Sequence, residues 1–174
     1  MTHEDELIRQ IKNGRQECLD ELIALYYPAI LRYCLWHMPD KESAQDAVQE
    51  TFLKLVRFID RYEHRGQFRA FLYRMASNTC IDMKRSAPTA TLLSEAGMEL
   101  ACYTENGFQT AEDRQQLAAA YAVLEEEAQE LVLLKYGQEL TLREIADIMG
   151  LPLRTVQSRL RKAVKAMRQA LDSA

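Results

Sequence analysis

Residues 140–163 read LTLREIADIMGLPLRTVQSRLRKA, and this stretch predicts two helices separated by a tight turn. Thr141 and Glu144 have the spacing of a capping box, so a short helix is expected over about 141–149. Gly150 is suited to end that helix, because glycine tolerates the left-handed conformation that closes many helices. A longer helix is expected from about residue 153, with Pro152 near its start, where a missing N–H donor costs little. Together these elements predict a helix-turn-helix.

The second helix of this pair carries a polar face that fits DNA. This face consists of Arg154, Thr155, Gln157, Ser158, Arg159, Arg161 and Lys162. Arginine and glutamine can pair with the edges of guanine and adenine, while serine, threonine and lysine commonly hold phosphates. A solvated helix face is the alternative, but the charges favour DNA. Residues 152–171 contain six basic residues and no acidic one, whereas residues 111–147 contain three basic and nine acidic residues.

Helical periodicity extends upstream of this motif. One stripe consists of Ala44, Ala47, Val48, Phe52, Leu55, Val56 and Ile59. Residues 86–110 differ, because they contain three acids, no base and no persistent apolar period. A connector of this length favours a linker between domains. We therefore predict an all-α protein with two small helical domains, 1–85 and 111–174, joined by a flexible linker over residues 86–110.

Composition and motif content exclude several classes of function. The 174 residues carry 22 bases and 26 acids, a formal charge of −4, which alone argues against a nucleic acid partner. No cysteine pair has C-x-x-C spacing, the three histidines complete no zinc pattern, and neither a P-loop nor G-x-G-x-x-G occurs. We expect no metal, no cofactor and no enzymatic activity. The acidic N-terminus and the short apolar stretches predict a cytoplasmic protein without membrane insertion.

A second basic stretch lies in the first domain, where residues 54–85 contain eight bases and three acids. Its arginines alternate with the aromatic residues Phe58, Tyr62, Phe68, Phe71 and Tyr73. Aromatic rings beside cations suit single-stranded nucleic acid, since bases stack and phosphates pair. Several of these rings also have the spacing of core residues, so stacking and packing both remain open.

An acidic and amide-rich face lies beside the apolar stripe of the 44–59 helix, at Asp46, Gln49, Glu50 and Thr51. Such a face is usually only solvated, and its chemistry alone identifies no interface.

Taken together, three segments resemble the small extracytoplasmic-function (ECF) group of bacterial sigma-70 factors. DAVQETF, residues 46–52, resembles the helix of region 2 that binds core RNA polymerase. FRAFLYRMASNTCIDMKR, residues 68–85, resembles the promoter-melting and −10-recognition segment. Residues 140–163 resemble the region 4 helix-turn-helix that recognises the −35 element.

The resemblance implies a two-domain protein that binds core RNA polymerase and directs it to particular promoters, with an anti-sigma factor as a further partner. It places Asp46, Gln49, Glu50 and Phe52 at the polymerase. It places Arg69, Phe71, Asn78, Asp82, Lys84 and Arg85 at the −10 element, with Asn78 at a loop that captures a flipped base. The polar face of the last helix, from Arg154 to Lys162, would lie in the −35 major groove.

Two departures from the family pattern fall on the base-reading surface. Arg154 stands where many relatives have glycine, and Gln157 where many have a basic residue, so the −35 preference of a typical member does not transfer. Three other functions remain as alternatives: a plain helix-turn-helix repressor or activator, a sigma-like decoy that sequesters an anti-sigma factor, and an enzyme. A repressor would need no polymerase, and a decoy would have lost its basic DNA-facing segments.

Overall fold

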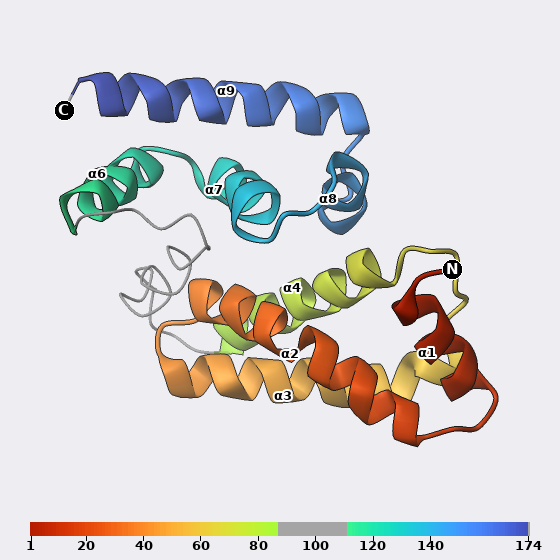
Figure 1. Ribbon diagram of the computed structural model, residues 1–174. Helices are drawn as coiled ribbons and strands as arrows, with labels where there is room; N and C mark the ends of the chain where they lie inside the picture. Colours follow the sequence, from red (N-terminus) through yellow and green to blue (C-terminus); the bar gives the residue numbers. More distant parts are fainter. Residues whose placement is uncertain (87–110, 174) are drawn as a thin grey trace. The chain divides into compact units, whose positions relative to one another are not determined.

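The computed structural model describes residues 1–86 and 111–173, and within these ranges all regular secondary structure is helical (Figure 1). These residues fall into two compact units, one holding residues 1–86 and the other residues 111–173. The predicted all-α fold with two helical domains is confirmed. The predicted linker lies outside the described residues, except for Ser86, which ends a helix. No helix in the described ranges is long and apolar enough to cross a bilayer.

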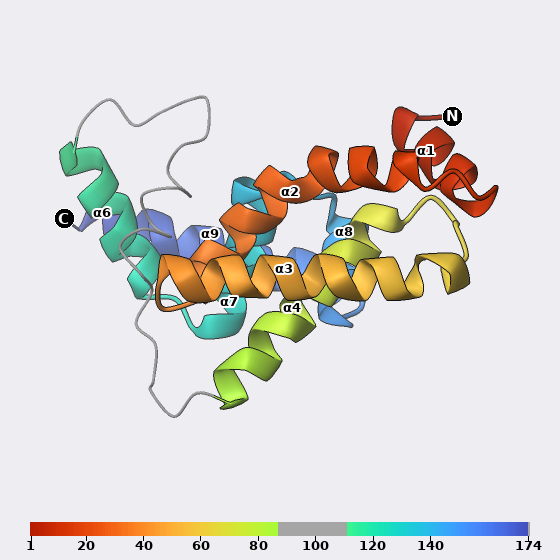
Figure 2. The same cartoon turned by 90° about the horizontal axis from the view of Figure 1, so that it is seen from below.

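The first unit is a small bundle of helices. Its elements are α1 (His3–Lys12), α2 (Glu17–His37), α3 (Lys41–Phe58), the short 3-10 turn η1 (Ile59–Arg61) and α4 (Phe68–Ser86). Helix α3 packs against both α2 and α4, and α1 packs against α2, as Figure 2 shows from below. The core between these helices is apolar, with Leu22, Ile30, Leu55, Phe68 and Leu72 fully buried. This packing fixes which sides of α3 and α4 face outward.

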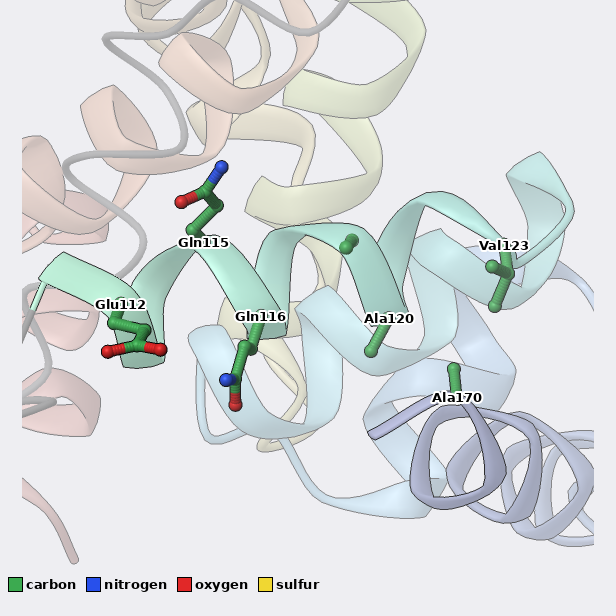
Figure 3. A pocket seen from close by; sticks show the side chains of 7 residues that line it. Glu112, Gln115, Gln116, Ala120, Val123 and Ala170 are labelled. Atoms are coloured by element: carbon green, nitrogen blue, oxygen red, sulfur yellow. The ribbon is translucent and has the colours of Figure 1, made fainter. Parts of the chain in front are cut away.

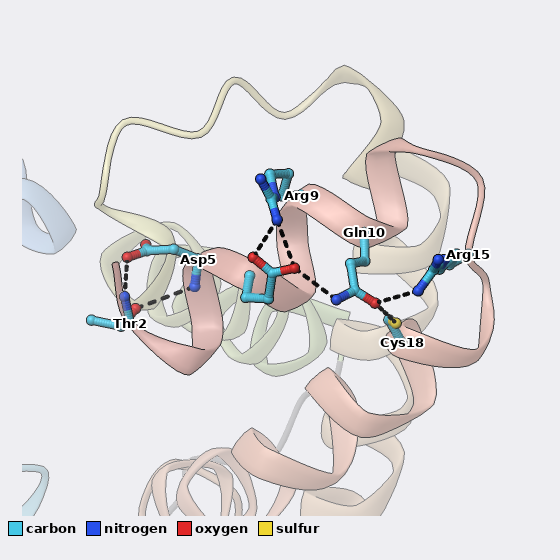
Figure 4. Close-up of polar contacts among 7 residues, drawn as sticks. Thr2, Asp5, Arg9, Gln10, Arg15 and Cys18 are labelled. Atoms are coloured by element: carbon cyan, nitrogen blue, oxygen red, sulfur yellow. Dashed lines mark hydrogen bonds and ion pairs between the residues drawn. The ribbon is translucent and has the colours of Figure 1, made fainter.

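Polar contacts hold α1 in place at both ends (Figure 4). At its start, Thr2 and Asp5 form a capping box, and His64 from the loop before α4 lies 2.7 Å from the Asp5 carboxylate. Near its end, the Gln10 side chain donates to Glu6 and accepts from Arg15 in the following turn. These contacts seat the buried residues of α1, namely Leu7, Ile8 and Ile11, against the domain.

The second unit is organised by the C-terminal helix. Its elements are α6 (Ala111–Ala122), α7 (Glu126–Val132), the π-helical turn η2 (Leu133–Gly137), α8 (Leu142–Met149) and α9 (Leu153–Asp172). Helix α9 packs against α6, α7 and α8 in turn, so that it runs along all three in Figure 1. Leu131, Leu134, Leu140 and Ile145 are fully buried beneath it.

The predicted helix-turn-helix is confirmed in its details. The Thr141 hydroxyl accepts from the Glu144 amide at 3.2 Å, and the Glu144 carboxylate accepts from the Thr141 amide at 2.8 Å. Gly150 ends α8 with φ 65° and ψ 32°, a left-handed conformation in which most other residues are strained. The amide of Leu151 then donates to the Ala146 carbonyl at 3.0 Å, which closes the turn.

One member of the predicted apolar stripe does not lie in the core. Val56 is 44% exposed, whereas Leu55 beside it is fully buried. Adjacent residues of an α-helix differ by about 100° in direction, so Val56 can point outward while Leu55 points into the core. The predicted stripe was therefore too wide on this side of α3.

Candidate nucleic-acid interface

The face of α9 that is rich in arginine and lysine points away from the rest of its unit. Arg154, Gln157, Ser158, Arg161 and Lys162 are all exposed, while Val156, Leu160 and Ala163 on the opposite side are buried. Lys165 and Arg168 continue the same face toward the C-terminus and are exposed as well. The packing of α9 on α7 and α8 therefore leaves one continuous cationic face on the outside.

Thr155 and Arg159 do not lie in the middle of this face. Thr155 is half-buried, and the Arg159 guanidinium forms an ion pair with the Glu127 carboxylate of α7. At 100° per residue along α9, Arg159 points roughly 140° away from the centre of the face that is rich in arginine and lysine. The sequence placed Arg159 among the DNA-facing residues, but the structure places it at the α7–α9 junction. Its partner could not be foreseen, because Glu127 lies in another helix.

Helix α4 presents a narrower outer face. Its exposed residues include Arg74, Asn78, Ile81, Asp82 and Arg85, which recur at helical spacing. Phe71, one of the predicted −10 residues, is half-buried at the N-terminal end of this face, and its ring centroid lies 4.6 Å from that of Tyr62. Sequence reasoning missed Arg74 and Ile81, although each lies one helical turn from Asn78.

Two predicted −10 residues lie elsewhere on α4. Arg69 and Lys84 are both half-buried. On a helical projection they fall on the side of α4 away from Asn78. The structure therefore brings together Asn78, Asp82 and Arg85 from the predicted set, with Phe71 at the edge, and separates Arg69 and Lys84 from them.

The aromatic residues of the basic stretch mainly build the core. Phe68 and Tyr73 are buried, with exposures of 0% and 2%. Tyr62 is half-buried against Phe68 and Phe71, and burial raises the pKa of its hydroxyl to about 12. Phe58 stays 46% exposed. The choice that the sequence left open is thus decided toward packing for Phe68 and Tyr73.

Helix α3 carries a mixed polar and apolar outer face. Asp46 and Gln49 are exposed, and Glu50 is half-buried. Beside them, Leu53 and Val56 are 50% and 44% exposed. Leu53 and Val56 lie four and seven residues after Gln49, which was a usable signal that the three share a face. The exposed leucine and valine add apolar area to a face that also carries carboxylate and amide groups.

Phe52 plays a different part from the one predicted. It is only 6% exposed, and its ring stacks on that of Tyr27 with the centroids 6.0 Å apart. Phe52 therefore packs α3 against α2 and supports the outer face from beneath.

Within the described residues, no metal-ligand cluster competes with these faces. No group of three or more potential metal ligands occurs there. A shallow groove of about 350 Å³ lies between one side of α6 and the end of α9 (Figure 3). Its lining includes Glu112, Gln115, Gln116, Val123 and Ala170, and it gathers a single carboxylate with no nucleophile or base beside it. Nothing in this groove favours an enzyme.

Comparison with known proteins gives the same division of the chain. Residues 22–88 match the model of sigma-70 region 2, and residues 114–167 match that of sigma-70 region 4. The ECF RNA polymerase sigma factor SigW of Bacillus subtilis is 28% identical to this chain, and the alignment covers 94% of each protein.

Two solved structures share the fold. One is CnrH in complex with the cytosolic domain of CnrY, with a TM-score of 0.71, 20% identity and 96% of each chain covered. The other is the sigma factor RpoE of Bartonella quintana in complex with the anti-sigma factor NepR, with a TM-score of 0.67 and 20% identity. That alignment covers 90% of this chain and 98% of the other. With regions 2 and 4 matched in order and a relative aligned over almost its whole length, this chain belongs to the sigma-70 family and, within it, to the ECF group of sigma factors.

Proposed function

We propose that this sigma factor uses three separate helix faces for three ligands: α3 for core RNA polymerase, α4 for the −10 element and α9 for the −35 element. Membership in the family establishes the general activity. The chain is a transcription initiation factor, not an enzyme, that binds core polymerase and directs it to promoters. The proposal concerns the residues that do so. It is carried by the continuous cationic face of α9, which lies directly opposite the buried side of that helix.

At the polymerase, the outer face of α3 supplies the contacts. Asp46, Gln49 and the exposed part of Glu50 offer carboxylate and amide groups, and Leu53 and Val56 offer apolar area one to two turns further along the helix. A partner helix with basic and apolar residues would match this face. Phe52 contributes by holding α3 on α2, so its replacement would weaken binding through packing.

At the −10 element, the outer face of α4 supplies the contacts. Asn78 has an exposed amide, which both donates and accepts hydrogen bonds, as capture of a flipped base requires. Arg85 lies two turns away on the same side and is placed for a phosphate. Phe71 is half-exposed at the edge, where its ring could support a base by stacking.

At the −35 element, α9 enters the major groove. Arg154, Gln157 and Arg161 carry side chains that can pair with base edges, while Ser158 and Lys162 are suited to phosphates. A helix-turn-helix places the N-terminal part of its second helix against the bases, which is where these residues lie.

The proposal also includes a protein partner and a cellular location. We expect an anti-sigma factor to bind this protein, because a sigma factor of the same fold was solved in complex with one. Since its ligands are polymerase and chromosomal DNA, we place the protein in the bacterial cytoplasm.

The decisive experiment reconstitutes holoenzyme from the purified protein and core polymerase, and transcribes sheared genomic DNA. Mapping the 5′ ends of the transcripts should reveal one family of promoters with common −10 and −35 elements. An Asp46→Ala, Leu53→Ala variant should lose core affinity, whereas Gln16→Ala, which removes an exposed amide from the turn before α2, should not. A protein that binds specific DNA sites but never binds core polymerase would instead be a helix-turn-helix repressor or activator, and the proposal would fail.

A further inference from the structure

Lys54 joins the two functional helices of the first unit. It lies on α3 directly after Leu53, but its side chain reaches the other way, toward α4, and is 27% exposed. Its ammonium donates to the Thr79 hydroxyl at 3.1 Å and lies 4.0 Å from the Asp82 carboxylate. Thr79 directly follows Asn78, and Asp82 lies one turn beyond it. One residue of the proposed polymerase helix thus contacts two residues of α4 that lie within one turn after the proposed base-capture position.

The hydrogen bonds of the Thr79 hydroxyl show what Lys54 contributes, namely a donor. Thr79 is 1% exposed, and its hydroxyl donates to the Met75 carbonyl at 2.9 Å, so its proton is already used. The hydroxyl oxygen can then only accept, and the Lys54 ammonium provides the donor. A buried polar group of this kind is stabilising when its partners are present and costly when one is removed.

The bond between Lys54 and Thr79 acts together with the apolar packing of α4 on α3. Apolar residues of both helices, such as Val48 and Leu55 of α3 and Leu72 and Ala76 of α4, are fully buried in the core of this unit. Apolar burial is not directional, whereas a hydrogen bond is. The Lys54–Thr79 bond therefore adds a directional constraint to the packing that orients α4 on α3, and with it to the direction in which Asn78 points.

The same ammonium also modifies the charge that DNA meets. The Asp82 side chain is 65% exposed on the outer side of α4 and would repel a nearby phosphate. Lys54 lies within 4.0 Å of that carboxylate and offsets its charge. The helix thus keeps a carboxylate beside Asn78 with a cation within ion-pair distance of it.

We propose that Lys54 is a positioning residue, which holds the −10-binding face of α4 in register with the polymerase-binding face of α3 through Thr79 and Asp82. This inference rests on the proposed function, because it assumes that α3 binds polymerase and α4 binds the −10 element. It assigns Lys54 to neither ligand.

The test uses Lys54→Met, which keeps the long side chain but removes the charge and the donors. Holoenzyme made with this variant should bind a single-stranded oligonucleotide carrying the mapped −10 element about tenfold more weakly, as expected for one lost bond to a charged donor. Permanganate footprinting should show fewer open complexes in the same proportion. Core affinity should remain unchanged. Lys54→Arg, which keeps a charged donor at this position, should bind the −10 element as well as the wild-type protein does. Lys41→Met, which removes an exposed lysine from the start of α3, is the matched control.

A double-mutant cycle separates positioning from general destabilisation. Thr79→Val removes the acceptor, so adding it to Lys54→Met should cause little further loss of −10 binding. If Lys54→Met lowers core affinity as much as −10 binding, Lys54 belongs to the polymerase surface and the inference is wrong. Unchanged −10 binding in Lys54→Met would also overturn it. Failure of the wild-type protein to bind core would instead contradict the proposed function, before any variant is considered.

Discussion

At the scale of single residues, Asn78 is the side chain whose chemistry is most closely matched to its proposed task. Its exposed amide offers a donor and an acceptor within one group, on the outer face of α4. We predict that Asn78→Ala lowers promoter opening by about 5- to 160-fold, the range expected for a lost base contact of about 1–3 kcal/mol. Core affinity should stay nearly unchanged, as measured by fluorescence anisotropy of labelled protein. Equal losses in core binding and opening would show instead that the substitution disturbs the fold of the first unit.

Arg159 is the residue whose expected role changes most once the fold is known. From the sequence, its substitution would be expected to cost about 1–3 kcal/mol of −35 affinity through a lost base contact. In the structure it pairs with Glu127, and both side chains are nearly half exposed, at 46% and 48%. We therefore predict that Arg159→Gln reduces affinity for every −35 sequence alike and lowers stability by less than about 1 kcal/mol.

Competition binding between −35 variants tests this prediction, with Glu127→Gln as the partner substitution. If the ion pair matters only for holding α9 on α7, both substitutions should have the same small effect and should not add. Selective loss of one base preference in Arg159→Gln would restore Arg159 to the base-reading set.

At the scale of elements, α1 depends on a carboxylate at its first turn. The Thr2 amide and the His64 side chain donate hydrogen bonds to Asp5, which lower its pKa from 3.8 to about 2. A lowered pKa means that the ionised form favours the folded state, so the contribution is present above pH about 4 and disappears as the pH falls toward about 2. We predict that α1 frays over this acidic range while the rest of the first unit stays folded.

Cα chemical shifts of Leu7, Ile8 and Ile11 would report the fraying of α1, with shifts in α3 as the internal reference. Asp5→Asn should fray at neutral pH and lose the acid transition. Asp20→Asn, which replaces an exposed carboxylate of α2, should behave like the wild-type protein. An acid transition that persists unchanged in Asp5→Asn would assign the effect to other carboxylates.

Helix α9 is longer than the groove it is proposed to enter. Its 20 residues span about 30 Å, whereas the major groove of B-DNA is about 12 Å wide. Lys165 and Arg168 lie about 17 and 21 Å along the helix from Arg154 and are therefore expected at phosphates. We predict that Lys165→Gln or Arg168→Gln reduces the slope of log affinity against log salt by about one without changing base preference. Arg161→Gln should change base preference instead. A change of preference in Lys165→Gln would contradict this division.

The helix-turn-helix shows how far local sequence signals extend. The Thr141–Glu144 box, the Gly150 turn and the buried side of α9 were all predictable, because each depends on residues close in the chain. The division of α4 into an outward face and a packed face could not be predicted from nearby residues. Asn78 and Lys84 both lie on one basic helix, and only the packing of α4 on α3 decides which faces outward. The same holds for Val56 and for the Arg159–Glu127 pair, whose environments are set by neighbouring helices.

At the scale of the whole molecule, the formal charge of −4 conceals an alternation of sign. Residues 1–53 carry five bases and ten acids, and residues 54–85 carry eight bases and three acids. In the C-terminal part, residues 111–147 carry three bases and nine acids, whereas residues 148–174 carry six bases and one acid. Each basic segment is therefore accompanied by an acidic one within the same unit. Net acidity does not argue against a DNA partner here, because the two proposed DNA faces fall in the two basic segments.

This alternation predicts that the free protein binds promoter DNA poorly. A phosphate backbone that approaches the cationic face of either unit also meets the field of its acidic segment, and one unit alone makes few phosphate contacts. At physiological salt we expect a Kd of about 10⁻⁴–10⁻⁶ M for the free protein on promoter and random DNA alike. Holoenzyme should bind its promoter with a Kd of about 10⁻⁸ M or tighter. A Glu125→Gln, Glu126→Gln variant, which removes two exposed acids of the second unit, should strengthen binding of the free protein to any DNA. Anisotropy titrations at several salt concentrations would measure both effects, and tight, promoter-specific binding by the free protein at physiological salt would refute the prediction.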